Sequence, residues 1–188
     1  MYSARVVCVI LAGTVLAALA GCGAGADQRP PAVAVRTCSV VGYGGLAADY
    51  RRRALILGPL ALGNLRTYRS ETPLPGKVGD RYGAYEVIAI VNAGTRPTLS
   101  LPRSEWASVG LLYDPGKFRD DGAYRIRDLD QVVHFRACRS PSFNHGVSQF
   151  DGGFVVTRPQ CVRFSVTVSG GRTYYYGEFP AAAKCPHA

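Results

Sequence analysis

The sequence lacks the short patterns by which most cofactor, metal and nucleic-acid sites are recognised. It contains no glycine-rich phosphate loop and no motif typical of nucleic-acid-binding domains. No two of its cysteines are close enough in sequence to match structural zinc sites, where paired ligands lie about two to four residues apart. We therefore expect no cofactor, no bound metal and no nucleic-acid partner.

Long apolar runs are also missing. The longest, Val6–Ala20, has 15 residues and follows a single basic residue, Arg5. Because a membrane-spanning helix needs roughly 20 residues, this run is a better match to the apolar region of a secretory signal peptide.

The end of this run has the pattern of a bacterial lipoprotein signal. The small residues Ala20 and Gly21 precede Cys22, the position at which such precursors are acylated and cleaved. We expect residues 1–21 to be removed and Cys22 to become the lipidated N-terminus, held at the outer face of the cytoplasmic membrane. The alternatives are an uncleaved anchor and an ordinary secretory signal cut near Ala26.

The chain after the signal predicts a tether and one domain. Residues 22–35 are rich in Gly, Ala and Pro, which is typical of a flexible linker. Residues 36–188 are long enough for a single domain with a sizeable core.

Lysine is scarce, with three residues against 19 arginines. After removal of residues 1–21 the chain keeps 21 basic and 13 acidic side chains, a net charge of +8. Such a domain is attracted to anionic lipids or anionic wall polymers, over about 8–10 Å at physiological salt. The alternative is a composition bias, because GC-rich coding also favours arginine.

Four cysteines remain once Cys8 is removed and Cys22 is acylated, and an even number in an oxidising compartment predicts two disulfides. Cys138 and Cys161 both lie in the polar phase of apparent strands, at the end of one and the start of the other. Adjacent antiparallel strands would bring them together. We therefore expect Cys138 to pair with Cys161, and Cys38 with Cys185.

Period-two alternation dominates the rest of the chain. It predicts strands over the following ranges: 38–43, 54–62, 85–92, 97–101, 109–113, 131–138, 154–157, 161–169 and 172–179. Gly58 and Pro59 predict a bulge or an edge in the second strand, and Asn92–Gly94 a hairpin turn. Gly170–Gly171 predicts a further hairpin.

Signals for helices are few. Residues 47–53 have helical spacing for one or two turns, and Ser104 is placed to cap a single turn that carries Trp106. Many short strands with two short helical turns predict an all-β fold. We expect a two-sheet antiparallel β-sandwich, immunoglobulin-like in the broad sense.

The C-terminal half contains a pattern of the form FxxC…GGFVVxxPxCV. It is carried by Phe135–Cys138, Gly152–Val156 and Pro159–Val162, preceded by residues 109–115. In these segments the chain resembles a group of secreted proteins and lipoproteins of actinobacteria that has no established activity. The resemblance implies an all-β extracytoplasmic domain, and it supplies no catalytic residue.

Several polar groups have the chemistry of a site but not its spacing. His145, Ser148 and Asp151 are the residue types of a hydrolytic triad, yet they share one short loop without a nucleophile elbow. His134 is predicted to be a surface imidazole. A cluster of aspartates lacks the ligand spacing of an EF-hand; it comprises Asp120, Asp121, Asp128 and Asp130. We therefore assign no catalytic and no metal-binding residue.

Two groups remain as candidate binding residues. Arg51, Arg52 and Arg53 are suited to binding an anionic headgroup. The alternative is that they only form the charged start of a strand or helix. Tyr174–Tyr176 are consecutive in a predicted strand, so at least one of their rings is expected in the core and at least one in solvent. Tyr174 and Tyr176 are the candidates for contacts with sugars or partner proteins.

These observations favour a non-enzymatic binding or accessory module of the cell envelope. Its expected partners are the membrane, through the lipid anchor, and an anionic lipid, a wall polymer or another exported protein. The alternative is an envelope hydrolase or transferase with a carboxylate site that spacing does not reveal. A pocket with converging carboxylates would favour the enzyme, and an exposed aromatic or basic patch the module.

Overall fold

The computed structural model describes residues 29–40, 46, 49–68, 83–119, 124–139, 146–170, 174–181 and 184–185. Contacts divide the chain into two units, Met1–Pro30 and Pro31–Ala188. Every element described below belongs to the second unit. The predicted signal peptide and Cys22 lie outside the described residues.

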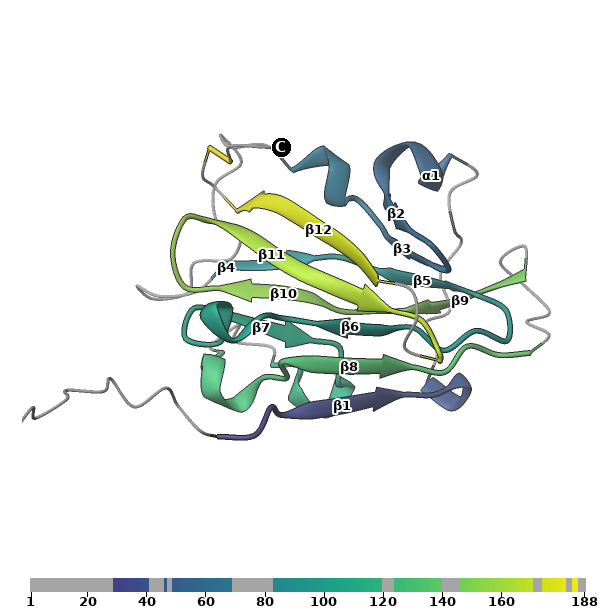
Figure 1. Cartoon of the computed structure of the whole chain (residues 1–188), viewed down its shortest axis with the longest axis horizontal. Helices are drawn as coiled ribbons and strands as arrows, with labels where there is room; N and C mark the ends of the chain where they lie inside the picture. The colour runs from purple at the N-terminus through teal and green to yellow at the C-terminus, as the bar shows by residue number, and fades with distance from the viewer. Residues whose placement is uncertain are drawn as a thin grey trace, which may run out of the picture. The chain divides into compact units, whose positions relative to one another are not determined.

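The first layer is a sheet of five strands in the order β1-β8-β6-β11-β12 (Figure 1). The strands are β1 (Val33–Arg36), β8 (Val132–Phe135), β6 (Thr98–Ser100), β11 (Gln160–Thr167) and β12 (Tyr174–Ala181). All neighbours are antiparallel except β1 and β8, which run parallel.

Two smaller sheets form the second layer, in the orders β2-β3-β5-β9 and β4-β10-β7. Their strands are β2 (Leu55–Leu57), β3 (Leu60–Leu62), β4 (Gly83–Glu86), β5 (Ala89–Asn92), β7 (Val109–Leu112), β9 (Val147–Phe150) and β10 (Gly153–Val156). The β4–β10 pair and the β5–β9 pair have the same antiparallel register. Between the two pairs, the Val87 N–H donates a hydrogen bond to the Gly152 carbonyl. The two sheets therefore continue into each other, and the fold is an all-β sandwich with two layers.

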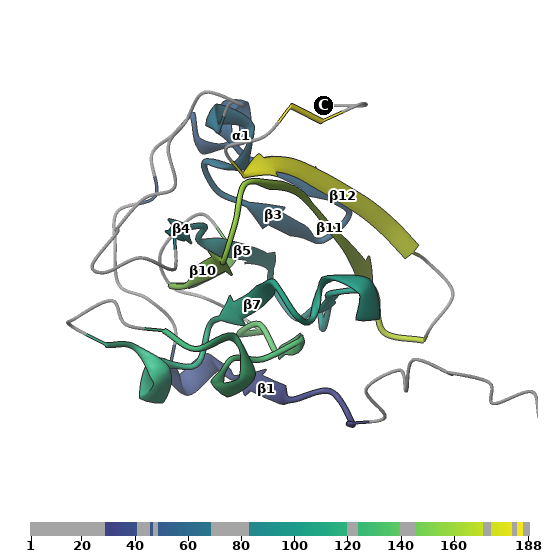
Figure 2. The ribbon, with the colours of Figure 1, turned by 90° about the vertical axis from the view of Figure 1, so that its left-hand side faces the viewer.

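Helical structure is short. The α-helix α1 (Tyr50–Arg53) lies beside β2 and β3 in both views (Figures 1 and 2). The 3-10 turns within the described residues are η1 (Cys38–Val40), η2 (Leu65–Thr67), η3 (Arg103–Glu105), η4 (Pro115–Lys117) and η5 (Ile126–Asp128). Ser104 lies inside η3, whose N-cap is Pro102, so the expected cap is wrong.

Aromatic side chains from both layers meet in the core. The ring centroid of Phe154 in β10 lies 5.4 Å from Phe164 in β11 and 5.1 Å from Phe179 in β12. The ring centroids of Tyr113 and Phe135 lie 5.3 Å apart, and the Tyr113 hydroxyl donates a hydrogen bond to the Val87 carbonyl at 2.7 Å. The alternation that the sequence predicted is confirmed within β8 and β11, where Val133, Phe135, Val162, Phe164 and Val166 are buried.

Several predicted elements differ from the observed ones. Cys38–Val40 is a 3-10 turn, and the first strand lies earlier, in the stretch expected to be a tether. Residues 54–62 form the β2–β3 hairpin, because Gly58 and Pro59 reverse the chain. The turn after Asn92 is not a hairpin, since β5 and β6 belong to different layers.

The disulfides join Cys38 to Cys138 and Cys161 to Cys185. The expected pairing of Cys138 with Cys161 is wrong because β6 lies between β8 and β11. Parallel β1 and β8 end side by side, which brings the Cα atoms of Cys38 and Cys138 within 5.0 Å. Cys161 pairs instead with the segment that follows β12, its hairpin partner.

Candidate binding surfaces

The outer face of the five-stranded sheet is formed by the strand positions that alternate with the core positions. The registers align these positions in two rows that cross all five strands. One row is Val33, Val132, Ser100, Ser165 and Tyr176, and the other is Val35, His134, Thr98, Thr167 and Tyr174. We call these ten residues the neutral face, because none of them is Asp, Glu, Lys or Arg.

The neutral face combines a projecting ring with hydroxyl groups. Tyr176 is 80% exposed, and Val33 and Val35 are each 48% exposed. Thr98 Oγ1 lies 2.8 Å from Nδ1 of His134, so these two neighbouring side chains are joined by a hydrogen bond. The predicted surface position of His134 is confirmed.

The remaining tyrosines follow the alternation. Tyr175 points toward the core and is partly buried against it, whereas Tyr176 points into solvent. Tyr174 occupies the register position opposite Thr167, and its side chain lies outside the described residues. The sequence prediction of one packed and one exposed ring is therefore confirmed for Tyr175 and Tyr176.

The three consecutive arginines lie on α1, and all of them are exposed. Arg53 pairs with Asp49 at 3.7 Å, and the Arg51 guanidinium lies 5.6 Å from the ring centroid of Tyr50. Two of the three therefore make local contacts within the helical turn. Their expected contact with an anionic lipid or wall polymer stays a prediction.

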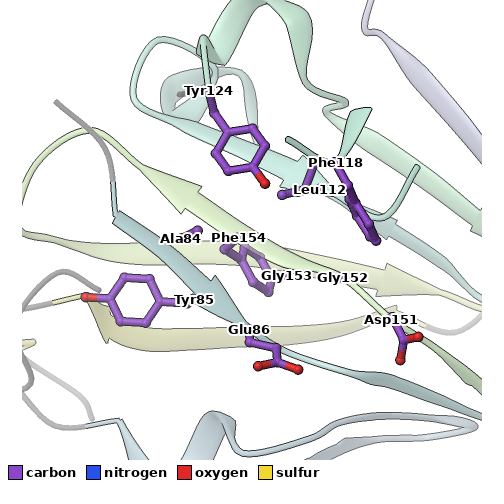
Figure 3. A pocket seen from close by; sticks show the side chains of 10 residues that line it. All are labelled: Ala84, Tyr85, Glu86, Leu112, Phe118, Tyr124, Asp151, Gly152, Gly153 and Phe154. Atoms are coloured by element: carbon purple, nitrogen blue, oxygen red, sulfur yellow. The ribbon is translucent and has the colours of Figure 1, made fainter. Parts of the chain in front are cut away.

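A pocket of about 240 Å³ lies on the opposite layer, beside β4, β10 and β7 (Figure 3). Gly152 and Gly153 form its middle. Figure 3 shows the rings of Phe118 and Tyr124 on one side of these glycines and the carboxylates of Glu86 and Asp151 on the other. Leu112, Ala84, Tyr85 and Phe154 complete the described lining.

Close packing of the backbone requires the glycine at the middle of this pocket. Glu86, Gly153 and Leu112 lie opposite one another on adjacent strands. A Cβ atom on Gly153 would overlap the carbonyl oxygen of Tyr85. Gly153 therefore permits the close approach of β4 and β10, and it lines the pocket together with Glu86 and Leu112.

The buried carboxylates of the domain lie outside this pocket. Burial raises the pKa of Asp130, while a hydrogen bond to Lys117 Nζ at 2.7 Å acts in the opposite direction. Burial also raises the pKa of Glu105, against the charge and the backbone N–H of Arg163. Both groups are therefore engaged in contacts within the protein.

Two of the three polar groups that the sequence analysis considered as a triad are described, and they lie in different environments. Ser148 is buried, and its Oγ accepts the N–H of Cys138 at 2.8 Å. Asp151 is exposed at the pocket, and His145 lies outside the described residues. Of the four aspartates, Asp130 is buried and Asp128 exposed, and the other two lie outside the described residues.

Three side chains of types that can bind metal ions lie close together at the end of the β11–β12 hairpin. Ligand atoms of Cys161, Glu178 and Cys185 all lie within 4.8 Å of one another. Because the two sulfur atoms form a disulfide, neither thiolate is available to a metal in this structure.

Sequence reasoning missed the pocket and the extent of the neutral face. The pocket depends on Phe118, Glu86 and Asp151, which come from three separate segments, and its one sequence signal is the Gly152–Gly153 pair. The neutral face had a clearer signal, namely serine and threonine in the outward phase of residues 97–101 and 161–169. The sequence does not reveal the order of the strands in the sheet, which is needed to align these residues in rows.

Comparison with known proteins adds no relative. No protein-family model matches the chain, and neither a curated protein nor a solved structure matches it. Among the described residues, no helix has the length and apolar character needed to cross a membrane. Function therefore has to be inferred from the geometry of the chain itself.

Proposed function

We propose that this protein is a non-enzymatic binding module of the cell envelope. It is held at the outer face of the cytoplasmic membrane by a lipid on Cys22, and it binds an uncharged glycan chain through the neutral face. The observation that carries the proposal is the exposed ring of Tyr176, which shares a row of five uncharged residues with Ser165 and Ser100.

The chemistry of the face matches that of a sugar chain. A sugar ring presents an apolar C–H surface that packs on an aromatic ring, and its hydroxyls both donate and accept hydrogen bonds. Tyr176 offers the ring, while Ser100, Ser165 and Thr167 offer hydroxyls that act in both roles. A row across five strands spans about 19 Å, so an extended oligosaccharide can contact several of these positions together.

The charge distribution favours a neutral ligand over a polyanion at this face. The chain has a net charge of +9, yet the ten positions of the neutral face contain no lysine or arginine. The nearest charged positions in the same phase lie at the edges of the face. Arg163 pairs with Glu178 at 3.8 Å, and the exposed Arg96 and Arg136 lie two residues from Thr98 and His134. An anionic polymer would meet no counter-charge among these ten side chains.

Two features support the proposed location. The Ala20-Gly21-Cys22 sequence is typical of lipoprotein precursors, and two disulfides are typical of an oxidising, extracytoplasmic compartment. A domain tethered on that side of the membrane is close to envelope polymers. The carboxylates whose pKa is raised, Glu105 and Asp130, make internal contacts, which favours binding over hydrolysis.

Co-sedimentation with insoluble chitin and cellulose, two neutral glycans, tests this function. The full-length protein, kept in a detergent without a sugar head group, is expected to sediment with at least one of them. Tyr176→Ala should weaken binding about tenfold, because loss of a stacked ring costs about 1–2 kcal/mol. Ser165→Arg, which introduces a charge in the middle of the face, should also weaken it.

The matched control is Phe118→Ala, which removes an exposed ring from the opposite layer and should leave glycan binding unchanged. Dextran sulfate provides an anionic comparison. Binding to it should depend on salt and be unaffected by Tyr176→Ala. No binding to either neutral glycan, or equal binding by wild type and Tyr176→Ala, would overturn the proposal.

A further inference from the structure

We propose that the pocket between β4, β10 and β7 binds a small organic cation, namely a protonated amine with an aliphatic body. This site is separate from the neutral face and does not depend on glycan binding. It lies on the other layer of the sandwich and is formed by different residues (Figure 3).

The charge of the pocket is opposite to that of the protein. The sequence contains 22 basic and 13 acidic residues, yet the described lining includes Glu86 and Asp151 and no Lys, Arg or His. Both carboxylates are exposed and are therefore accessible to a ligand. The nearby buried Arg36 interacts electrostatically with Asp151 and Asp114, so part of the negative charge of Asp151 is already balanced. Glu86 is therefore expected to contribute more than Asp151 to cation binding.

The rings favour an organic cation over a metal ion. Phe118 is 44% exposed and Tyr124 9% exposed, and both border the same hollow as Leu112. Ring faces attract ammonium groups, and ring and leucine carbons accommodate an aliphatic chain. Calcium, in contrast, takes about six to eight oxygen ligands, whereas the described lining side chains include two carboxylates and two phenols.

The size of the pocket sets the scale of the ligand. Its volume of about 240 Å³ exceeds a cavity that holds benzene, about 150 Å³, and is smaller than most pockets for drug-sized molecules, about 300–1,000 Å³. An amine-bearing sugar unit or amino-acid side chain has suitable dimensions. The probe for such a ligand is n-butylamine, which is protonated at neutral pH.

The test is a titration of the isotopically labelled full chain with n-butylammonium, followed by amide chemical shifts. Shifts are expected at residues 84–86, 112, 118, 124 and 151–154. Glu86→Gln should raise the dissociation constant at least fivefold, Asp151→Asn by a smaller factor, and Phe118→Ala at least threefold. Added salt should weaken binding by wild type and have less effect on Glu86→Gln.

Two ligands and one variant serve as controls. 1-Butanol has the same chain without the charge, and butyrate has the opposite charge, so neither should shift these amides comparably. Tyr176→Ala should bind n-butylammonium as wild type does, and circular dichroism should show that each variant is folded. Equal shifts with 1-butanol, unchanged affinity in both Glu86→Gln and Phe118→Ala, or the absence of shifts in the pocket would each overturn the proposal.

Discussion

At the scale of single residues, Glu105 illustrates the cost of burying a charge. It ends the 3-10 turn η3 and is 7% exposed. Burial raises its pKa above the ordinary value of 4.5, although the charge and backbone N–H of Arg163 and the charge of Arg158 act in the opposite direction. The net effect is that ionisation of Glu105 is less favourable in the folded protein than in the unfolded chain.

This shift predicts a pH dependence of stability. A carboxyl group whose pKa is higher when folded favours the folded state while it is protonated, and this contribution is lost as pH rises above 4.5 toward the folded value. Glu105→Gln keeps a neutral hydrogen-bonding side chain. Its free energy of unfolding, relative to wild type, should therefore be higher at pH 7 than at pH 4 when both are measured by urea denaturation. A difference that stays constant or falls with pH would contradict this account.

At the scale of elements, local pattern predicted where most strands lie but not how they pair. The alternation in residues 131–138 and 161–169 identified the buried faces of β8 and β11, and Gly170, at φ 100°, lies in the turn between β11 and β12. Strand order depends on contacts between distant segments. For this reason the position of β6 between β8 and β11, and the parallel pairing of β1, could not be derived from spacing.

The junction between β9 and β10 provides a test at this scale. A Cβ atom on Gly153 would overlap the backbone of Tyr85, which cannot move without disturbing the β4–β10 pairing. Gly153→Ala should therefore lower the free energy of unfolding by about 1–3 kcal/mol or more, measured by urea denaturation. Gly116→Ala is the control, because its Cβ would meet only the side chain of Asp114, at 3.3 Å. Equal effects of the two substitutions would contradict the tight packing at Gly153.

At the scale of the whole molecule, the disulfides connect segments that the strand order makes adjacent. Cys38–Cys138 joins the ends of two parallel strands that are 100 residues apart in sequence. Cys161–Cys185 joins the β11–β12 hairpin to the segment that follows it, across 24 residues. The even number of cysteines could be read from the sequence, whereas this connectivity required the fold.

Non-reducing peptide mapping should recover these two pairs. In the chain-entropy model, the 100-residue closure stabilises by about 4.7 kcal/mol and the shorter one by about 3.5 kcal/mol. Replacing Cys38 and Cys138 together by serine should therefore lower the unfolding free energy more than replacing Cys161 and Cys185. Recovery of a peptide that joins Cys138 to Cys161 would contradict the observed strand order.

The central claim is that the neutral face binds an uncharged glycan. An amide chemical-shift titration of the full chain with chitohexaose, a soluble neutral oligosaccharide, tests it most directly. The account predicts that shifts concentrate on the two rows that cross the five-stranded sheet, with the largest at Tyr176, Ser165 and Ser100, and that Tyr176→Ala removes most of them. Shifts confined to other surfaces, or no shifts at millimolar oligosaccharide, would contradict it.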